Sequence, residues 1–177
     1  MDKIFFKCSI DYDFSFIYGL DWDIEKTLYL DFKKKENTET IKMFGDYPDS
    51  LNDHNTYIYQ KFFNHEEVDY EILGKQLNME LHTVSVIKQR PGTVIPIHHD
   101  AFFRLAQKFP DSAHRAMRAN IFIEDWEWGH FFQIDNVNPE SWVKNTGYVF
   151  NNKVIHSSAN ASFRDKYTLQ CTGFLNE

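Results

Sequence analysis

The sequence has very little cysteine and no long apolar run. Cys8 and Cys171 are the only cysteines among 177 residues, too few for the disulfide framework of a small secreted domain, so we expect two free thiols. No segment approaches the roughly 20 consecutive apolar residues of a membrane-spanning helix. Charged residues interrupt the apolar runs of residues 1–14, a pattern unlike a signal peptide. These absences predict a cytoplasmic protein that does not interact with membranes.

A strongly basic surface is also missing. The formal net charge is -7, and the short lysine run at 33–35 is followed by Glu36. Because phosphate backbones are held mainly by clustered Lys and Arg, this charge balance disfavours nucleic acid as a partner. A small molecule or a protein side chain is the expected substrate. The oligomeric state is left open, with a dimer contact through the N-terminal region as one alternative.

Aromatic and strand-favouring residues are abundant: 17 Phe and 9 Tyr are present, and 42% of residues are hydrophobic. The length indicates a single domain, 1–177. From residue 80 onward, short apolar segments are separated by turn residues, which predicts a mainly β fold of the jelly-roll or barrel type, a cupin-like double-stranded β-helix. The segments expected to be strands are 80–90, 93–100, 118–126, 129–136, 147–152, 154–160 and 166–175.

The N-terminal part reads as mixed α+β. We expect strands at 3–10, 14–20 and 27–32, and a turn-rich connection at 46–55. Apolar residues near helical spacing favour helices at 55–63 and 66–78. The expected plan is therefore a supporting α+β region, 1–79, packed on a catalytic β-barrel core, 80–177.

Two titratable residues, His98 and Asp100, follow an apolar segment and the turn-like Arg90–Gly92. Such groups are costly to bury unless something binds them. On a strand, residues two apart point to the same face, so His98 and Asp100 project together and His99 points away. A neutral imidazole beside a carboxylate predicts two ligands of a divalent metal.

The third ligand has to come from another segment, and His114, His130 and His156 are the candidates. We favour His156, which follows an apolar strand and a tight turn late in the β region. Two histidines and one carboxylate on one side of a metal leave three positions open. That arrangement is the one used by non-haem Fe(II) oxygenases, whose open positions take O₂ and a co-substrate.

A co-substrate such as 2-oxoglutarate would bring a second carboxylate deep into the barrel. A buried cation has to meet that charge, because an unpaired buried carboxylate is very costly. Arg164 and Lys166 follow His156 within one short segment and share the same strand parity. The spacing leaves both open as the anchor.

These pieces together resemble the iron(II)/2-oxoglutarate-dependent oxygenases, specifically the small single-domain members of the aspartyl/asparaginyl β-hydroxylase-like and phage types. The matching segments are "PGTVIPIHHD", "RANIFI" and "GYVFNNKVIHSSANASFRDKYTLQ", within about residues 80–175. The resemblance implies that His98, Asp100 and His156 bind iron and act in catalysis. It favours Lys166 over Arg164 as the 2-oxoglutarate anchor.

Two further positions follow from the same resemblance. Relatives of the β-hydroxylase type have Arg-x-His near the co-substrate, where this chain has Arg118-Ala119-Asn120. Arg118 matches, and Asn120 departs but can still donate a hydrogen bond to a carboxylate. Members that install halogen lack the carboxylate ligand, so Asp100 favours hydroxylation or a related C–H oxidation with release of succinate and CO₂.

Four residues are candidates for substrate contact. His99 would face the substrate or support the metal ligands, and Arg104 would hold an acidic group beside the metal. His114 lies in a connection expected to cover the site, and His130 lies in a strand. Two alternatives stay open: a cupin-like metalloenzyme that does not use 2-oxoglutarate, and a noncatalytic jelly-roll binding module.

Overall fold

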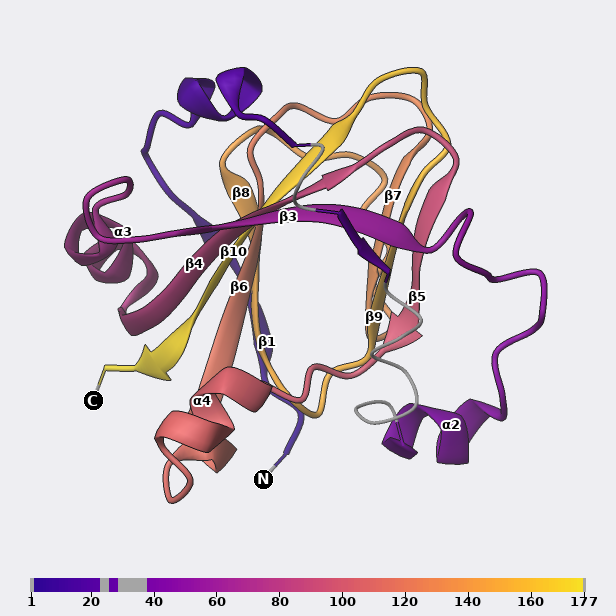
Figure 1. Cartoon of the computed structure of the whole chain (residues 1–177). Coiled ribbons are helices and arrows are strands. Elements are labelled where there is room, and N and C mark those ends of the chain that lie inside the picture. Colours follow the sequence, from indigo (N-terminus) through magenta and orange to yellow (C-terminus); the bar gives the residue numbers. More distant parts are fainter. Residues whose placement is uncertain (1, 23–25, 29–37, 177) are drawn as a thin grey trace.

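Two facing antiparallel sheets make up the body of the protein in the computed structural model, which describes residues 2–22, 26–28 and 38–176. The larger sheet has the order β1 (Phe5–Ser9), β8 (Thr146–Asn151), β6 (Ala116–Phe122), β10 (Lys166–Leu175), β4 (Met79–Gln89), β3 (Tyr57–Phe63), β2 (Lys26–Leu28). The smaller sheet has the order β5 (Thr93–His98), β9 (His156–Asn160), β7 (His130–Ile134). Figure 1 shows the smaller sheet facing the long central strands of the larger one. The architecture is a double-stranded β-helix, which confirms the predicted fold class.

Short helices lie around the sheets. They are α2 (Thr38–Phe44), α3 (Tyr70–Leu77), α4 (Phe103–Lys108) and 3-10 turns at Ser15–Gly19 and Ala113–Arg115. Helix α3 begins where the Asp69 side chain accepts a hydrogen bond from Ile72 N at 2.9 Å, an N-cap that satisfies one free backbone donor. It packs on the outer face of the larger sheet (Figure 1). No helix in the described ranges is long and apolar enough to cross a membrane.

The two faces of the larger sheet differ in chemistry because side chains alternate along each strand. On β4, Val84 and Val86 point outward into an apolar core that also contains Leu73 of α3. Thr83 and Ser85, from the same strand, point inward and line a pocket between the two sheets. The outer face therefore supplies stability, and the inner face is free to be polar and functional.

The predicted strands after residue 80 are all present, with shifted ends. The segment 93–100 stops being a strand at His98, so Asp100 lies beyond β5. Helix α4 interrupts the connection that follows. Cys8 and Cys171 are free thiols, as expected.

Two N-terminal predictions were wrong. Residues 55–63 contain strand β3, not a helix. Both faces of β3 are in contact with protein: Tyr59 and Phe63 join the outer core, whereas Ile58 and Phe62 line the pocket. Apolar residues on both faces erase the alternation of a strand and mimic helical spacing.

The segment 14–20 is a 3-10 turn, not a strand. Ile17 is fully buried against the outer face of the larger sheet. It is the only buried residue of this turn, so one turn is enough to place it in the core. The helix predicted at 66–78 is confirmed in part as α3. The strand predicted at 27–32 is described only through Leu28, within β2, and its remainder lies outside the described residues.

Strands β1, β2 and β3 hydrogen-bond into the larger sheet, so the N-terminal part extends the barrel and supplies one wall of the pocket. The division into a supporting region and a catalytic core at residue 80 stays a prediction.

Candidate metal centre

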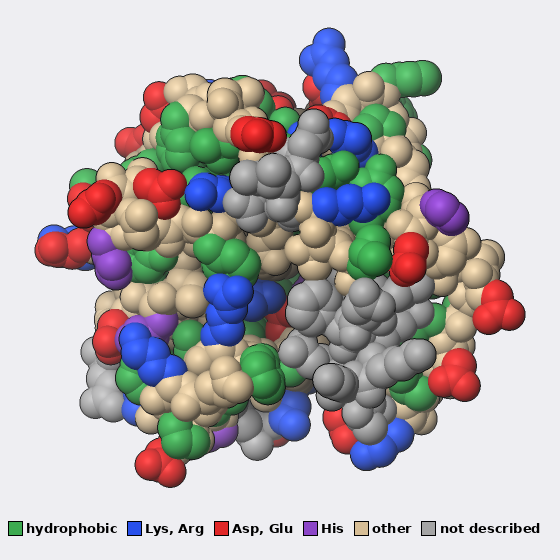
Figure 2. Space-filling model, viewed as in Figure 1, with side chains coloured by type: hydrophobic (Ala, Val, Ile, Leu, Met, Phe, Trp, Pro, Cys, Tyr) green, Lys and Arg blue, Asp and Glu red, His purple; other side chains and the backbone are tan. Residues whose placement is uncertain are grey.

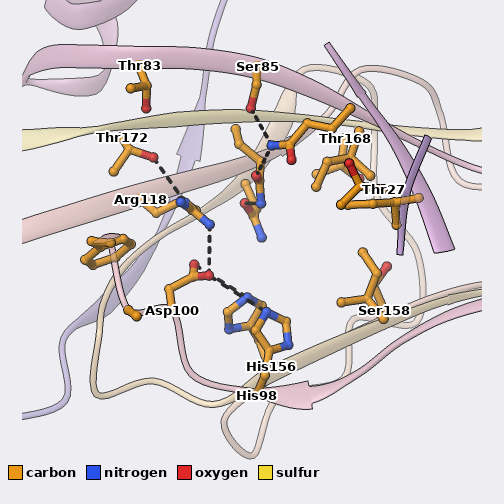
Figure 3. A pocket seen from close by; sticks show the side chains of 18 of the residues that line it. Thr27, Thr83, Ser85, His98, Asp100, Arg118, His156, Ser158, Thr168 and Thr172 are labelled. Atoms are coloured by element: carbon orange, nitrogen blue, oxygen red, sulfur yellow. Dashed lines mark hydrogen bonds and ion pairs between the residues drawn. The ribbon is translucent and has the colours of Figure 1, made fainter. Parts of the chain in front are cut away.

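Three side chains from separate positions in the chain converge at one end of the smaller sheet. His98 ends β5, His156 begins β9, and the two are paired in register, with ring centroids 4.1 Å apart. Asp100 Oδ1 lies 3.8 Å from His98 Nε2, and Oδ2 lies 3.7 Å from His156 Nε2. One potential ligand atom from each residue lies within 4.8 Å of the others (Figure 3). These separations exceed hydrogen-bond length and suit atoms that share a metal ion.

The protonation states also suit metal binding. Burial lowers the pKa of His98, and burial together with the adjacent His98 lowers the pKa of His156 to about 3. Burial acts to raise the pKa of Asp100, but Arg118 and the two imidazoles outweigh it and lower that pKa. At neutral pH the site therefore holds two neutral imidazoles and a carboxylate, the forms that coordinate a cation without first losing protons.

Arg118 of β6 fixes the carboxylate of Asp100. Its Nη1 lies 2.8 Å from Asp100 Oδ1, and its Nε donates to Thr172 Oγ1 at 3.1 Å. The guanidinium also lies 5.2 Å from the ring of Phe102. Oδ2 of Asp100 is buried without a hydrogen-bond partner among the described residues. One oxygen is thus held by protein, and the other is left for a ligand.

Asp100 reaches the site because the chain turns sharply after β5. Phe102 adopts φ 48, a left-handed conformation that is unusual for a bulky residue, and its side chain is buried. This turn takes the chain directly into α4. The backbone strain at Phe102 is stored next to a functional group, as is common in binding sites.

A pocket of about 300 Å³ extends from this triad between the sheets. Its inner wall is formed mainly by uncharged polar side chains, several of them linked: Gln60 Nε2 donates to Ser85 Oγ at 3.0 Å, and Gln170 Nε2 donates to Asn120 Oδ1 at 3.1 Å. The volume is at the lower end of the range for ligand sites. Figure 2 shows a hollow on this face of the molecule between β3 and α4.

A second polar cluster lies at the other end of the pocket. Lys166 of β10 is 2% exposed, and its Nζ donates to Phe131 O at 2.6 Å and to Ser158 Oγ. Ser158 in turn donates to Gln89 Oε1 at 2.7 Å, while Gln89 Nε2 is buried without a partner in the described part of the chain. Burial lowers the pKa of Lys166 to about 7. The described structure therefore gathers donors here and supplies no carboxylate for them.

The other predicted cofactor residues are placed differently. Arg164 points outward: its side chain is 78% exposed and pairs with Glu127 at 3.1 Å. The structure does not bring it to the pocket, because the turn before β10 sends it to solvent. Asn120 lines the pocket, but Arg118 contacts Asp100 rather than the Lys166 cluster.

The four predicted substrate residues divide evenly. Arg104 and His99 line the pocket, and His99 Nδ1 lies 2.8 Å from Thr40 Oγ1 of α2. His114 is exposed on a 3-10 turn, away from the pocket. His130 is buried beside Trp142 and outside the pocket lining, with ring centroids 6.3 Å apart.

Sequence reasoning missed Ser158 and Gln89. The signal for Ser158 was present, since it follows His156 by two residues on one strand and so shares its face. Gln89 has the same parity as Ser85 on β4, but nothing in the sequence indicates which β4 face is the inner one.

Comparison with known proteins supports the fold. The chain matches no protein-family model and no curated protein sequence. Among solved structures, a prolyl-4-hydroxylase from Pseudomonas putida is similar, with TM-score 0.53 and 13% identity over 98% of this chain and 92% of that one. The non-heme alpha ketoglutarate dependent epimerase SnoN from nogalamycin biosynthesis gives TM-score 0.58 and 10% identity over 96% of this chain and 76% of that one. At these identities the likeness shows a shared double-stranded β-helix.

Proposed function

We propose that this protein is an Fe(II)- and 2-oxoglutarate-dependent dioxygenase. It would couple oxidation of a substrate C–H bond, typically hydroxylation, to conversion of 2-oxoglutarate and O₂ into succinate and CO₂. The substrate would be a small molecule or a protein side chain. The observation that carries the proposal is the buried triad of His98, Asp100 and His156, with two neutral imidazoles and an ionised carboxylate, at the edge of the pocket between the sheets.

The residues fit the metal. Two imidazole nitrogens and one carboxylate oxygen are the donor set of non-haem Fe(II) oxygenases, and Asp100 Oδ2 is the buried oxygen that lacks a partner. Iron with 2-oxoglutarate and O₂ would supply the oxidising chemistry. The protein's own contribution is to hold the triad, with Arg118 keeping Asp100 ionised and oriented.

The residues also fit the co-substrate. Ser158 is two residues along β9 from His156, a step of about 7 Å, and Lys166 Nζ and the unpartnered Gln89 Nε2 lie beside Ser158. A dicarboxylate with one end at the triad would place its other carboxylate among these donors. The anchor is supported by a buried lysine that has no carboxylate partner among the described residues.

Catalysis in this site would depend on exclusion of water and on fixed donors. The apolar residues Ile87, Ile95 and Phe132 line the pocket beside the polar wall. They would keep the reacting centre dry, while the hydrogen-bonded amides of Gln60 and Gln170 hold the wall rigid. The two solved structures named above, a prolyl-4-hydroxylase and an alpha ketoglutarate dependent epimerase, support only the fold.

One observation favours the alternative of a cupin-like metalloenzyme that does not use 2-oxoglutarate. Lys166 already donates to two protein oxygens and is not itself part of the pocket lining. In that case its role would be to hold β7 and β9 together. A noncatalytic jelly-roll module would bind no stoichiometric metal.

A calorimetric measurement distinguishes these functions. It determines the binding of 2-oxoglutarate to the Mn(II)-loaded protein under anaerobic conditions. The dioxygenase requires binding that depends on metal and weakens in Lys166→Met by roughly 10- to 100-fold, the loss of one or more charge-assisted hydrogen bonds. Arg164→Ala is the matched control and should bind normally. Succinate formation with Fe(II) and ascorbate should follow the same order. Failure of the metal-loaded wild type to bind 2-oxoglutarate excludes the proposal.

A further inference from the structure

The pocket has a second cationic end, formed by Arg104 on α4. Its guanidinium carbon lies 4.0 Å from the centre of the Phe62 ring of β3, and Arg104 and Phe62 both line the pocket. No described carboxylate lies within ion-pair distance of Arg104. Phe103, beside it, is also part of the lining and about half exposed. Within the part of the chain that the structure describes, the pocket entrance therefore presents a positive charge that has no carboxylate partner and lies between aromatic surfaces.

This end lies opposite the Lys166 cluster. Lys166 pairs in register with Gln89 of β4, and Phe62 pairs with Ser85 of the same strand. Four residues of strand separate these two levels, about 13 Å. Figure 3 shows Arg118 and Thr83 on one side of His98 and His156, and Ser158 on the other. A ligand held at Arg104 and one held at Lys166 would approach the triad from opposite sides.

The charges of the lining favour an anion at the entrance. Among the described lining residues, the charged side chains are Arg104, Arg118 and Asp100. Asp100 and Arg118 form an ion pair at 2.8 Å and neutralise each other. Arg104 therefore gives the described lining a net positive charge before any metal binds. A divalent cation at the triad would make the pocket more positive still. Arg104 and a metal ion at the triad would both favour a substrate with a negative charge.

The size of the pocket and the side chains around Arg104 narrow the chemical class of the substrate further. The pocket of about 300 Å³ would have to hold 2-oxoglutarate and the reacting part of the substrate. Phe62, Phe103 and Leu105 offer apolar contact around Arg104, and a planar guanidinium pairs well with a planar carboxylate. We propose that the substrate is a small carboxylic acid with an apolar body, whose carboxylate binds Arg104 and whose chain reaches toward the triad. This inference rests on the proposed function.

The test uses the full chain loaded anaerobically with Mn(II), with and without saturating 2-oxoglutarate. The probes are 4-methylpentanoate and 3-phenylpropanoate, their primary amides, and phenyl phosphate, with binding measured by calorimetry and thermal shift. The acids should bind at least roughly tenfold tighter than the matching amides, as expected for a charge-assisted pair. Arg104→Gln should remove this preference. Lys108→Gln, on the same helix but outside the lining, should retain it.

Three results would overturn the inference: equal binding of acids and amides, tighter binding of phenyl phosphate than of the acids, or an unchanged preference in Arg104→Gln. Absence of binding by either acid to the wild type would also overturn it. Because 2-oxoglutarate binding is measured in the same experiment and depends on Lys166, its failure identifies a fault in the proposed function. Normal 2-oxoglutarate binding without acid preference identifies a fault in the substrate class alone.

Discussion

Arg118 and Asp100 form an ion pair, Nη1 to Oδ1 at 2.8 Å, that leaves Asp100 Oδ2 3.7 Å from His156 Nε2 and without a hydrogen-bond partner among the described residues. The pair joins the larger sheet to the loop that follows the smaller sheet. It therefore sets the position of a candidate metal ligand that no strand holds directly.

Replacing Arg118 with Met should weaken metal binding without removing it. The carboxylate of Asp100 would lose its orienting partner, and loss of such a supporting contact typically costs about 10- to 100-fold in metal affinity. Thr172→Val, which removes only the acceptor of Arg118 Nε, should have a smaller effect in the same direction. Calorimetric titration with Mn(II) measures both. Equal affinities in wild type and Arg118→Met would show that Asp100 does not depend on this pair.

His156→Ala should abolish stoichiometric metal binding, whereas His99→Ala should retain it. His156 lies in the triad, whereas His99 is not part of it and its Nδ1 is engaged with Thr40 Oγ1. Metal content after anaerobic loading and desalting gives the comparison. A metal-loaded His156→Ala protein, or a metal-free His99→Ala protein, would contradict the assigned ligands.

Lys166→Met should stabilise the ligand-free protein below about pH 7. Burial lowers the pKa of Lys166 from 10.5 to about 7, so the folded state binds fewer protons than the unfolded state between these values. The resulting penalty is full below about pH 7 and disappears as the pH rises toward 10.5. The shift corresponds to an upper limit of roughly 5 kcal/mol. Urea unfolding at pH 6.5 and 9.5 should show a variant advantage that is larger at the lower pH. A constant difference would mean that Lys166 is not a strained buried cation.

The affinity for 2-oxoglutarate should fall as the pH rises above about 7. The anchor has to be protonated to pair with a carboxylate, and its pKa in the free protein is about 7. Between pH 6.5 and 8.5 the dissociation constant of the Mn(II)-loaded protein should rise by up to roughly 25-fold. Lys166→Met should bind weakly with a flatter profile. Constant affinity in the wild type across this range would argue against Lys166 as the anchor.

The sequence predicts most of the strands and the metal-binding triad, but for a different physical reason in each case. The strands after residue 80 are bounded by turn residues such as Gly92 and Gly147, so their existence is local information. Strand β3 was misread because both of its faces are covered, which is a property of the folded sheet. The proximity of His98 and His156 could be predicted, because a β-barrel can bring the strand that carries His156 beside the one that carries His98.

The direction of individual long side chains could not be read from the sequence. Lys166 and Arg164 are two residues apart and both positively charged, so strand alternation predicts that they point to the same face. Lys166 is nevertheless buried beside Ser158, whereas Arg164 pairs with Glu127 at the surface. Residue Arg164 precedes the first residue of β10, where alternation no longer decides which way a side chain points. The partners of Arg118 likewise depend on the loop that carries Asp100.

The most direct test of the central claim is a crystal structure of the protein grown anaerobically with Mn(II) and 2-oxoglutarate. We expect one metal ion bound by His98, His156 and Asp100 at about 2.0–2.2 Å, with the 2-oxoglutarate chelated to it and its distal carboxylate within hydrogen-bond distance of Lys166 Nζ. Metal bound elsewhere, or a triad that remains hydrogen-bonded only to protein while metal is in excess, would contradict the account.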